Sequence, residues 1–441
     1  MARSPSGRIP LNVYLNGRLV GRLRRESSGA IDFQYDQSWL DWENAIPVST
    51  SLPLREDRYI GDPVIAVFEN LLPDNEEIRR RVAERAHAEG SDAYSLLAAI
   101  GRDCVGALQF MPDGAVPTPA AQIEAQAITN DQIADLLKDL ALNPLGMGTD
   151  REFRISLAGA QEKTALLYWK NQWHKPHGTT ATTHILKPQI GKLPSGIDLS
   201  KSVENEYLCL ELVRALGLPT AKSAIQDFAG RRVLVIERFD RIWTRDGRLL
   251  RIPQEDCCQA LSVPPSRKYE SDGGPGIRNL VDLMKGSDAP DEDQKTIFKA
   301  QIVFWLLGAT DGHAKNFSIR LAPAGRFRLT PLYDVVSTQP SVDAGQISHN
   351  QMKLAMAVGA KRHYVVNTIL GRHFVQTANL CGLPRKLVTE VIEELGDTAK
   401  SEIEQTLGKL PNDFPGAIAD SITKAAKHRI DTLTNISNNA A

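Results

Sequence analysis

The chain has 441 residues, of which 42% are hydrophobic and 24% are charged, and its formal net charge is -1. This length allows two or three subdomains around a large core, and the composition argues against a disordered chain. The near-zero charge excludes a general polyanion binder, although six arginines precede the first acidic residue, Glu26. Such a small basic edge is usually a solvated face.

The cysteines and the apolar runs indicate a cytoplasmic protein. The five cysteines are odd in number and scattered, without the paired Cys-x-x-Cys spacing that would indicate zinc or a disulfide framework. The chain starts without an apolar stretch, and the longest apolar run, residues 302–307, is too short to span a membrane. We therefore expect reduced thiols and access to ATP.

The first predicted elements are a hairpin and two helices. Leu11, Val13 and Leu15 alternate with other residues before Asn16 and Gly17, a strong signal for a tight hairpin turn. Helical patterns follow over residues 64–72 and 75–88. A stretch rich in proline and alanine, residues 113–121, indicates a surface connection. We therefore predict an N-terminal subdomain over residues 1–112 and a connecting segment over 113–150.

The remaining pattern changes from strands to helices. Strands are predicted over residues 154–157, 164–169, 184–187 and 233–237, with a helix over 203–216. From residue 279 onward the pattern is mostly helical, except for extended pieces at 317–321 and 327–332. A strand-rich part over 151–260, followed by a helical part over 261–441, is the order of the two lobes in a protein kinase.

A polar turn follows the apolar helix predicted before Gly308. It reads G-A-T-D-G-H-A-K-N and places Asp311 five residues before Asn316. Protein kinases use this spacing for a catalytic base and a metal ligand. The spacing alone is a weak match, and a surface loop explains the polarity equally well.

Other segments supply the remaining parts of a phosphoryl-transfer site. Asp334 follows Asn316 by 18 residues, so the two could share Mg²⁺ while Asp311 accepts the proton of the attacking hydroxyl. Lys187 ends a predicted strand, where its ammonium could hold phosphates, and either Glu204 or Glu206 could pair with it.

Two further segments fit a nucleotide. The small residues 158–160 lie between two predicted strands, where backbone N–H groups could approach phosphates, although an ordinary turn explains them as well. The strand that ends at Glu237 could serve as a hinge reading adenine, with Asp240 near the ribose.

Several long motifs occur together along the chain: F-R-I-S-L-A-G-A-Q-E-K-T-A-L, T-T-H-I-L-K, E-R-F-D, P-Q-E-D, K-Y-E-S-D-G-G-P-G-I, G-A-T-D-G-H-A-K-N-F-S and L-T-P-L-Y-D. In these motifs the chain resembles the HipA family of bacterial serine/threonine kinase toxins, and the resemblance covers essentially its full length. It implies a two-lobed, kinase-like α+β fold with a β-containing N-terminal subdomain and an all-helical C-lobe. The stretches S-L-P-L-R and F-E-N-L-L-P-D are similar to the family's N-terminal subdomain.

The resemblance also implies roles for individual residues. Asp311 matches the catalytic base, Asn316 and Asp334 match the magnesium ligands, and Ser156 matches an autophosphorylated serine. A phosphate on Ser156 would switch the kinase off, because a dianion cannot lie where the phosphates of ATP bind. Nucleotide-binding positions are Ala158, Gly159, Ala160, Gln161, Glu162, Lys163, Lys187, Glu237, Arg238, Phe239, Asp240, His313 and Tyr333.

The family further implies ATP and Mg²⁺ as cofactors and several macromolecular partners. These are a dimeric helix-turn-helix antitoxin, HipB, operator DNA reached mainly through the antitoxin, and an aminoacyl-tRNA synthetase as substrate. The residues do not identify the target. A small-molecule phosphotransferase and a catalytically silent co-repressor remain alternatives. The loop at residues 188–200 is either a segment that orders when substrate docks or a passive surface loop.

Overall fold

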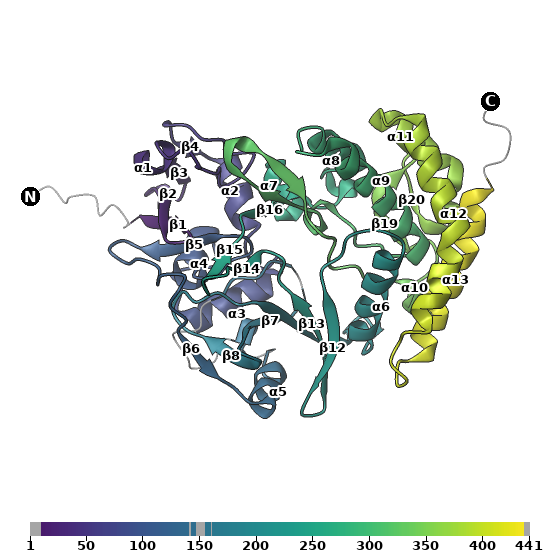
Figure 1. Cartoon of the computed structure of the whole chain (residues 1–441), viewed down its shortest axis with the longest axis horizontal. Helices are drawn as coiled ribbons and strands as arrows, with labels where there is room; N and C mark the ends of the chain where they lie inside the picture. Colours follow the sequence, from purple (N-terminus) through teal and green to yellow (C-terminus); the bar gives the residue numbers. More distant parts are fainter. Residues whose placement is uncertain (1–9, 141–142, 147–154, 160, 436–441) are drawn as a thin grey trace, which may run out of the picture.

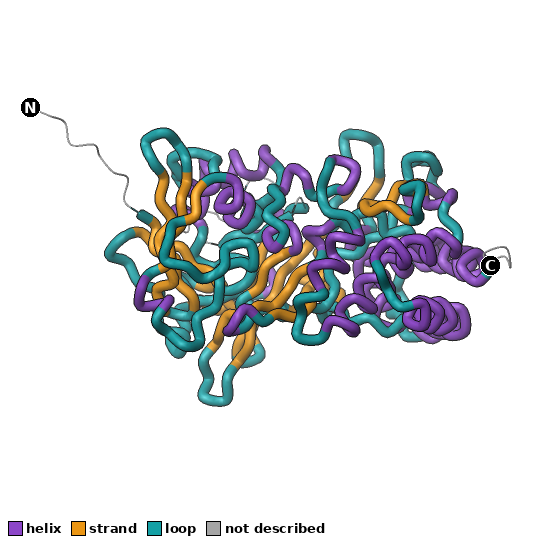
Figure 2. Tube along the Cα trace, turned by 90° about the horizontal axis from the view of Figure 1, so that it is seen from above, coloured by secondary structure: helices purple, strands orange, loops and turns teal. Residues whose placement is uncertain are grey.

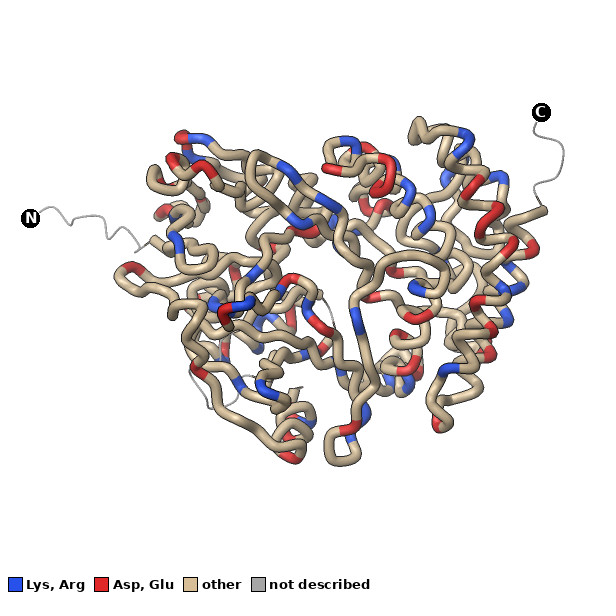
Figure 3. Tube along the Cα trace, viewed as in Figure 1, with Lys and Arg blue, Asp and Glu red and all other residues tan. Residues whose placement is uncertain are grey.

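The computed structural model describes residues 10–140, 143–146, 155–159 and 161–435. In Figure 1 the chain passes from an N-terminal unit through a strand-rich lobe to a helical lobe at the opposite end. Figure 2 shows the strands concentrated toward the N-terminal side and the long helices toward the C-terminal side. This order agrees with the predicted mixed α/β, kinase-like fold. Positively and negatively charged residues are interspersed over the view in Figure 3.

The N-terminal unit is an antiparallel sheet covered by short helices. Its five strands have the order β4-β3-β2-β1-β5: β1 (Leu11–Leu15), β2 (Arg18–Arg25), β3 (Ile31–Tyr35), β4 (Tyr59–Ile60) and β5 (Leu108–Pro112). The predicted hairpin is confirmed, because Asn16 and Gly17 form its turn with φ values of +48° and +85°. The helices are α1 (Gln37–Leu40), α2 (Asp62–Glu69), α3 (Glu76–Ala86) and α4 (Ala93–Ile100).

The strand-rich lobe is built on a six-stranded antiparallel sheet. Its order is β12-β13-β9-β7-β8-β6, formed by β6 (Ala125–Ala127), β7 (Thr164–Trp169), β8 (Gln172–Pro176), β9 (His184–Pro188), β12 (Ser223–Phe228) and β13 (Arg231–Glu237). Helices α5 (Asn130–Lys138) and α6 (Ser202–Ala215) pack against this sheet. Three predicted strands and the predicted helix are therefore confirmed as β7, β9, β13 and α6.

Two small hairpins and a three-stranded sheet connect the lobes. The hairpins pair β10 (Gly191–Lys192) with β11 (Asp198–Leu199) and β14 (Arg241–Trp243) with β15 (Leu249–Arg251). The three-stranded sheet contains β16 (Gln254–Asp256), β17 (Ser318–Leu321) and β18 (Phe327–Leu329). Helix α7 (Cys257–Ala260) follows β16, and the five cysteines are all free and buried.

The helical lobe surrounds one long buried helix, α9 (Pro290–Leu307). A proline and three acidic residues in its first turn favour helix initiation, and its second half is buried on all sides. Around it lie α8 (Ile277–Met284), α10 (Gln339–Asp343), α11 (Gly371–Cys381), α12 (Arg385–Leu407) and α13 (Gly416–Thr434). The lobe is not all-helical, because it also holds β17, β18 and the hairpin of β19 (Lys353–Val358) with β20 (His363–Val365).

One prediction of local structure was wrong, and the predicted connecting segment contains two regular elements. Residues 155–157 of the predicted strand 154–157 form no strand. Ser156 instead hydrogen-bonds to the N-terminal unit: its N–H donates to the backbone oxygen of Asp103, and its hydroxyl donates to the backbone oxygen of Leu71. Residue 154 lies outside the described residues. The predicted connection over 113–150 contains β6, which extends the six-stranded sheet, and α5, which buries Ile133 and Leu137 against that sheet.

Among the described residues, no helix is both long and apolar enough to cross a membrane.

Candidate active site

A cavity of about 530 Å³ lies where the three parts of the chain meet, a size typical of small-molecule sites. It gathers most of the site residues expected from sequence: Ala158, Gly159, Gln161, Lys163, Lys187, Glu237, Arg238, Phe239, Asp240, Asp311, His313, Asn316, Tyr333 and Asp334. Glu162 is not in its lining and pairs instead with Arg81, at 3.2 Å. Ala160 lies outside the described residues. Residues separated by more than 150 positions in the chain therefore converge on one cavity.

The catalytic-loop candidate leaves the end of α9 through Gly308. This glycine has φ +67°, and a Cβ atom there would collide with the side chain of Met352. The loop then exposes about half of the Asp311 side chain (53%). The amide group of Asn316 donates a 2.7 Å hydrogen bond to the backbone oxygen of Asp311, which closes the loop. This bond and the 3-10 turn η4 (Ala314–Asn316) therefore fix the Asn316 side chain relative to the backbone of Asp311.

Asp334 is held beside Lys187 by an unusual backbone conformation. It has φ +60°, which is uncommon for a residue with a side chain and often marks a functional position. The ammonium of Lys187 lies 2.5 Å from an Asp334 oxygen and 2.7 Å from a Glu206 oxygen. The helix glutamate that pairs with Lys187 is therefore Glu206. Glu204 is bound instead by Arg232 and Gln189.

Burial and charge act in opposite directions in this ion cluster. Burial would raise the pKa of Asp334, but Lys187 and Lys163 outweigh it and hold the pKa below its ordinary value. Burial would lower the pKa of Lys187, but Asp334 and Glu206 raise it. Lys187 and Asp334 are therefore both ionised near neutral pH. Lys163 differs, because burial and then the charge of Lys187 lower its pKa to about 8.

Two described residues of the nucleotide-loop candidate, Ala158 and Gly159, lie close to the ammonium of Lys163. The ammonium of Lys163 donates a 2.9 Å hydrogen bond to the backbone oxygen of Ala158. Gly159 has φ +106°, and a Cβ atom there would lie 2.7 Å from that ammonium. Glycine is therefore favoured here by its backbone conformation, and a larger residue would also displace the Lys163 ammonium.

The donor set fits one Mg²⁺ ion that is also held by a nucleotide. Within the described residues, no group of three or more histidine, cysteine or acidic side chains is arranged to hold a metal. Mg²⁺ usually takes one or two protein carboxylates together with phosphate oxygens rather than a complete protein cage. Asn316 and Asp334 line the same cavity, so they could supply the protein ligands.

Comparisons with known proteins show the family of this chain. Residues 11–111 match the HipA N-terminal domain and residues 155–403 match the HipA-like C-terminal domain. The second match covers more than half of the chain. The chain belongs to the HipA family.

Individual relatives cover almost the whole length of this HipA-family chain. The protein Y4mE of Sinorhizobium fredii, whose name classes it as a kinase, is 34% identical, with 90% of this chain and 92% of the relative covered. The serine/threonine-protein kinase toxin HipA of Shewanella oneidensis is 27% identical over 91% of this chain and 90% of its own. The solved structure of Shewanella oneidensis HipA with HipB and its operator DNA has a TM-score of 0.79 at 24% identity, covering 96% and 98% of the two chains. The names of the first two relatives therefore associate them with kinase activity in general.

The hinge candidate of this HipA-family chain continues from β13. The N–H of Glu237 donates to Lys222 and that of Arg238 donates to Thr183, both at 2.9 Å. Phe239 lies in the cavity lining, with its ring centroid 5.9 Å from that of Tyr333. The Tyr333 hydroxyl is itself fixed by Ser318 and by the backbone oxygen of Lys315. The two rings can therefore form part of the wall for a planar base.

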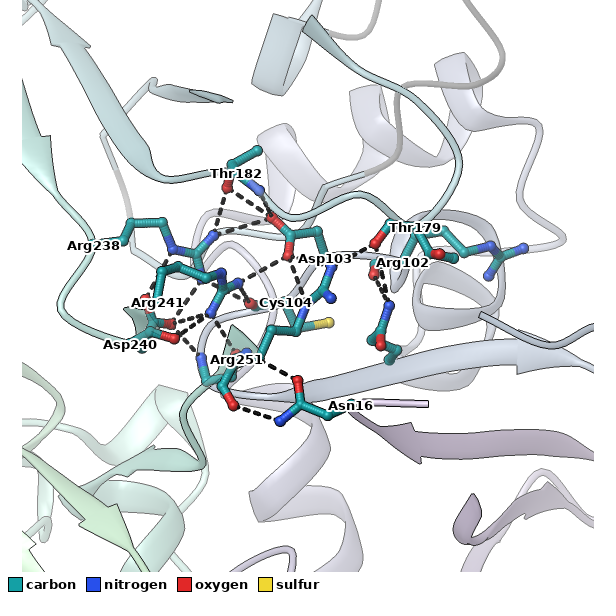
Figure 4. A network of polar contacts seen from close by, with 12 residues as sticks. Asn16, Arg102, Asp103, Cys104, Thr179, Thr182, Arg238, Asp240, Arg241 and Arg251 are labelled. Carbon is teal, nitrogen blue, oxygen red and sulfur yellow. Dashed lines mark hydrogen bonds and ion pairs between the residues drawn. The ribbon is translucent and has the colours of Figure 1, made fainter. Parts of the chain in front are cut away.

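The polar side-chain atoms of Arg238 and Asp240 bind other groups of the protein. Figure 4 shows them in a buried network with Asp103, Arg241 and Arg251. Both oxygens of Asp240 accept hydrogen bonds from Arg238, at 3.0 and 2.8 Å, and one also accepts from the N–H of Gly106 at 2.7 Å. Asp240, expected near a ribose, therefore lines the cavity while its carboxylate belongs to an ion cluster behind the cavity wall.

Ser156 is buried outside the cavity lining. Its hydroxyl donates a 2.7 Å hydrogen bond to the backbone oxygen of Leu71, in the N-terminal unit. The side chain has no accessible surface, so this position cannot accept a phosphate without moving.

Sequence reasoning missed several cavity residues. Asp74 comes from the N-terminal unit and receives hydrogen bonds from Lys315 at 2.5 Å and Lys268 at 2.8 Å. Burial would raise the pKa of Asp74, but these two lysines lower it to about 2. Gln254 and Asp256 also line the cavity. Asp74 lies in the motif F-E-N-L-L-P-D, Lys268 in K-Y-E-S-D-G-G-P-G-I, and Gln254 and Asp256 in P-Q-E-D. These motifs were the available signal, but the family resemblance assigned no role to their residues.

Proposed function

We propose that this chain is a serine/threonine protein kinase toxin that transfers the γ-phosphate of ATP to a serine of a translation enzyme. The supporting observation is the convergence of Asp311, Asn316, Asp334 and Lys187 on one cavity, with Lys187 held between Asp334 and Glu206. Phosphoryl transfer requires mainly the positioning of phosphates and the neutralisation of charge, which such a set can supply.

Each residue then has a chemical task. Asp311 accepts the proton of the attacking serine hydroxyl, and its half-exposed carboxylate leaves room for that hydroxyl. Lys187 and Lys163 bind phosphate oxygens, while residues 158–163 cradle them with backbone N–H groups. Phe239 and Tyr333 contact the base, and the hinge backbone at Glu237 reads it. Asn316 and Asp334 bind Mg²⁺, which would neutralise charge that develops on the phosphates.

The proposed partners come from the family and from named relatives. The Shewanella oneidensis HipA structure contains HipB and operator DNA, which supports a HipB-like antitoxin dimer as a partner and co-repression as a second role. The proposed substrate is an aminoacyl-tRNA synthetase, with glutamyl-tRNA synthetase as the first candidate. The protein then works in the cytoplasm, and at the nucleoid when bound to antitoxin and operator.

We also propose that autophosphorylation of Ser156 switches the kinase off. A phosphoserine there would place a dianion against the backbone oxygen of Leu71 and remove the hydroxyl proton that now binds it. The segment would have to leave its buried position, and the adjacent residues 158–163 would lose their place. Phosphopeptide mapping of the wild type and Ser156→Ala should show phosphate on Ser156 only in the former, and phosphate mapped elsewhere would refute this switch.

A labelling experiment tests the kinase. The purified chain is incubated with γ-labelled ATP, Mg²⁺ and glutamyl-tRNA synthetase, in parallel with Asp311→Asn and with the control Asp397→Asn, which changes an exposed aspartate of α12. We expect label on a synthetase serine with the wild type and the control but not with Asp311→Asn. Label on a small molecule alone would favour a small-molecule phosphotransferase, and no label anywhere would favour a silent co-repressor.

A further inference from the structure

The segment between α7 and α8 crosses from the N-terminal unit to the catalytic loop. We call residues 264–276 the strap. Lys268 of the strap binds Asp74 of the N-terminal unit, and Tyr269 binds Asp311 of the catalytic loop. Glu270 accepts a 2.6 Å hydrogen bond from the N–H of Ala357 in β19, which lies in the helical lobe. Three consecutive side chains therefore attach the strap to three parts of the molecule.

Glycines make the strap compact and leave it little room to move. Gly273 has φ +83°, and the N–H of Gly274 donates a 2.9 Å hydrogen bond to the backbone oxygen of Tyr269. A Cβ atom on Gly274 would collide with the backbone oxygen of Arg267, and one on Gly276 would lie 2.6 Å from the Glu270 carboxyl carbon. The backbone that carries Tyr269 is therefore fixed by its own close contacts.

The hydroxyl of Tyr269 contacts one carboxylate oxygen of Asp311, the expected catalytic base. It donates a 2.5 Å hydrogen bond to Asp311 Oδ1, and its ring meets His313 edge to face with centroids 4.9 Å apart. Burial and the charge of Asp311 raise the pKa of Tyr269, so the phenol keeps the proton that it donates. In the part of the chain that the structure describes, no side chain or backbone group donates to Asp311 Oδ2.

The other charged groups near Asp311 do not replace this contact. His313 Nε2 lies 3.8 Å from Asp311 Oδ1, beyond hydrogen-bond distance, and burial lowers the pKa of His313. Lys268 and Lys315 are both bound to Asp74. Asp334 is bound to Lys187. Tyr269 is thus the group whose side chain fixes the orientation of the Asp311 carboxylate.

We propose that Tyr269 is a positioning residue for the catalytic base, holding Asp311 through Oδ1 so that Oδ2 faces the hydroxyl of the protein substrate. This inference rests on the proposed kinase function. A carboxylate held at one oxygen needs no reorientation when the substrate arrives, and correct orientation of a reacting group is worth orders of magnitude in rate. Because Tyr269 belongs to the strap, the base is also linked to the N-terminal unit through the neighbouring Lys268–Asp74 pair.

Tyr269→Phe is the sharpest test, since it removes the hydroxyl and keeps the ring that packs against His313. We expect kcat for transfer to the protein substrate to fall about 10- to 100-fold. The KM for ATP and the affinity for a fluorescent ATP analogue should stay within about twofold of the wild type, because Tyr269 does not line the nucleotide cavity. The matched control is Tyr168→Phe, which removes the hydroxyl of a partly exposed tyrosine in β7.

The outcomes separate this inference from the proposed function. A wild type that transfers no phosphate would refute both. An active wild type with an unchanged Tyr269→Phe variant would refute only the role of Tyr269, and so would a faster variant, which would mean that the hydroxyl blocks the base. A parallel loss of ATP affinity would assign Tyr269 a structural role instead. Phosphate found on Tyr269 itself would make the residue an acceptor and overturn the proposal as well.

Discussion

The carboxylate of Asp103, from the N-terminal unit, lies 3.2 Å from the guanidinium of Arg238, the residue that follows β13 of the six-stranded sheet. Both side chains are almost fully buried, with 2% of their surface exposed. The Asp103 carboxylate also accepts hydrogen bonds from Arg241, from Arg251 and from the hydroxyl of Thr182, as Figure 4 shows. The N-terminal unit is therefore attached to the hinge through buried charges, where an unpaired partner is costly.

Asp103→Asn should strongly destabilise the protein. Burial would raise the pKa of Asp103, but three arginines lower it, so the native state holds a carboxylate that they need. Removing its charge leaves Arg238 and Arg241 with Asp240 as their acidic partner and takes away the carboxylate that pairs with Arg251. We expect the free energy of unfolding to fall by about 3–5 kcal/mol in urea denaturation.

The control for Asp103→Asn is Asp246→Asn, which breaks an exposed pair with Arg248. Water and salt screen an exposed pair, so the stability of this variant should be close to that of the wild type. Equal effects of the two substitutions would show that the buried network does not support the interface.

Glu206→Gln should impair nucleotide use, whereas Glu204→Gln should not. The two glutamates are both buried in the first turns of α6, but only Glu206 contacts Lys187. Without the charge of Glu206, Lys187 is attracted more strongly to Asp334, its other partner, and less well placed for phosphates. We expect kcat/KM for ATP to fall at least about 10-fold for Glu206→Gln, by analogy with other positioning losses. Steady-state kinetics of both variants checks this, and equal losses would argue against a specific role for the Lys187–Glu206 pair.

The parts of the site that could be predicted are those that local sequence determines. Asp311 and Asn316 are five residues apart within one loop, so their spacing favoured a common role once Lys187, Asp334 and the family motifs were considered with it. Glu206 could not be separated from Glu204, because residues two apart on a helix point about 200° apart and only the docking of α6 decides which one faces Lys187. Asp74 and Tyr269 reach the site through contacts between distant segments, which no local pattern encodes.

The same limit explains why the ion contacts of Asp240 were not predicted. Its position after the E-R-F motif placed it near a hinge, and it does line the cavity. Its carboxylate turns toward Arg238, Arg241 and Gly106, because the N-terminal unit brings Asp103 and buried backbone groups to the same place. A sequence pattern within one lobe carries no information about that neighbour.

Glu255→Gln should change how stability depends on pH. Burial raises the pKa of Glu255 to about 7, against an ordinary value of 4.5, although Thr50 donates two hydrogen bonds to one of its oxygens. A raised native pKa means that the stabilising contribution is complete below pH 4.5 and is lost as the pH rises to about 7. The wild type should therefore lose about 1.4 kcal/mol per pH unit from this group in that window.

Glu255→Gln removes this loss, because a glutamine oxygen still accepts from Thr50 and carries no charge. The free energy of unfolding of the variant should rise relative to that of the wild type as the pH increases from 4.5 to about 7. Above this range the difference should stay constant. Urea denaturation at several pH values measures the difference, with Glu292→Gln as the control for an exposed glutamate. A difference that does not vary with pH would contradict the buried, protonated carboxyl.

Gly274→Ala should reduce turnover by displacing the strap. A Cβ atom at this position would collide with the backbone oxygen of Arg267 and approach that of Tyr269 to 2.7 Å, so the backbone that carries Tyr269 has to shift. Since backbone atoms cannot rotate away as a flexible side chain can, the shift should move the Tyr269 hydroxyl off Asp311. We expect kcat to fall about 10-fold or more while ATP affinity is retained.

Gly325→Ala is the matched control for this substitution. It lies in the turn between β17 and β18 with φ +71°, and a Cβ atom there meets nothing within 4 Å. It therefore carries the backbone strain of alanine at positive φ, which costs about 1 kcal/mol, without a collision at the active site. Kinetics and melting temperatures of both variants separate the effects: similar stability losses with lost turnover only in Gly274→Ala would support the strap, whereas full turnover in Gly274→Ala would show that the base does not depend on it.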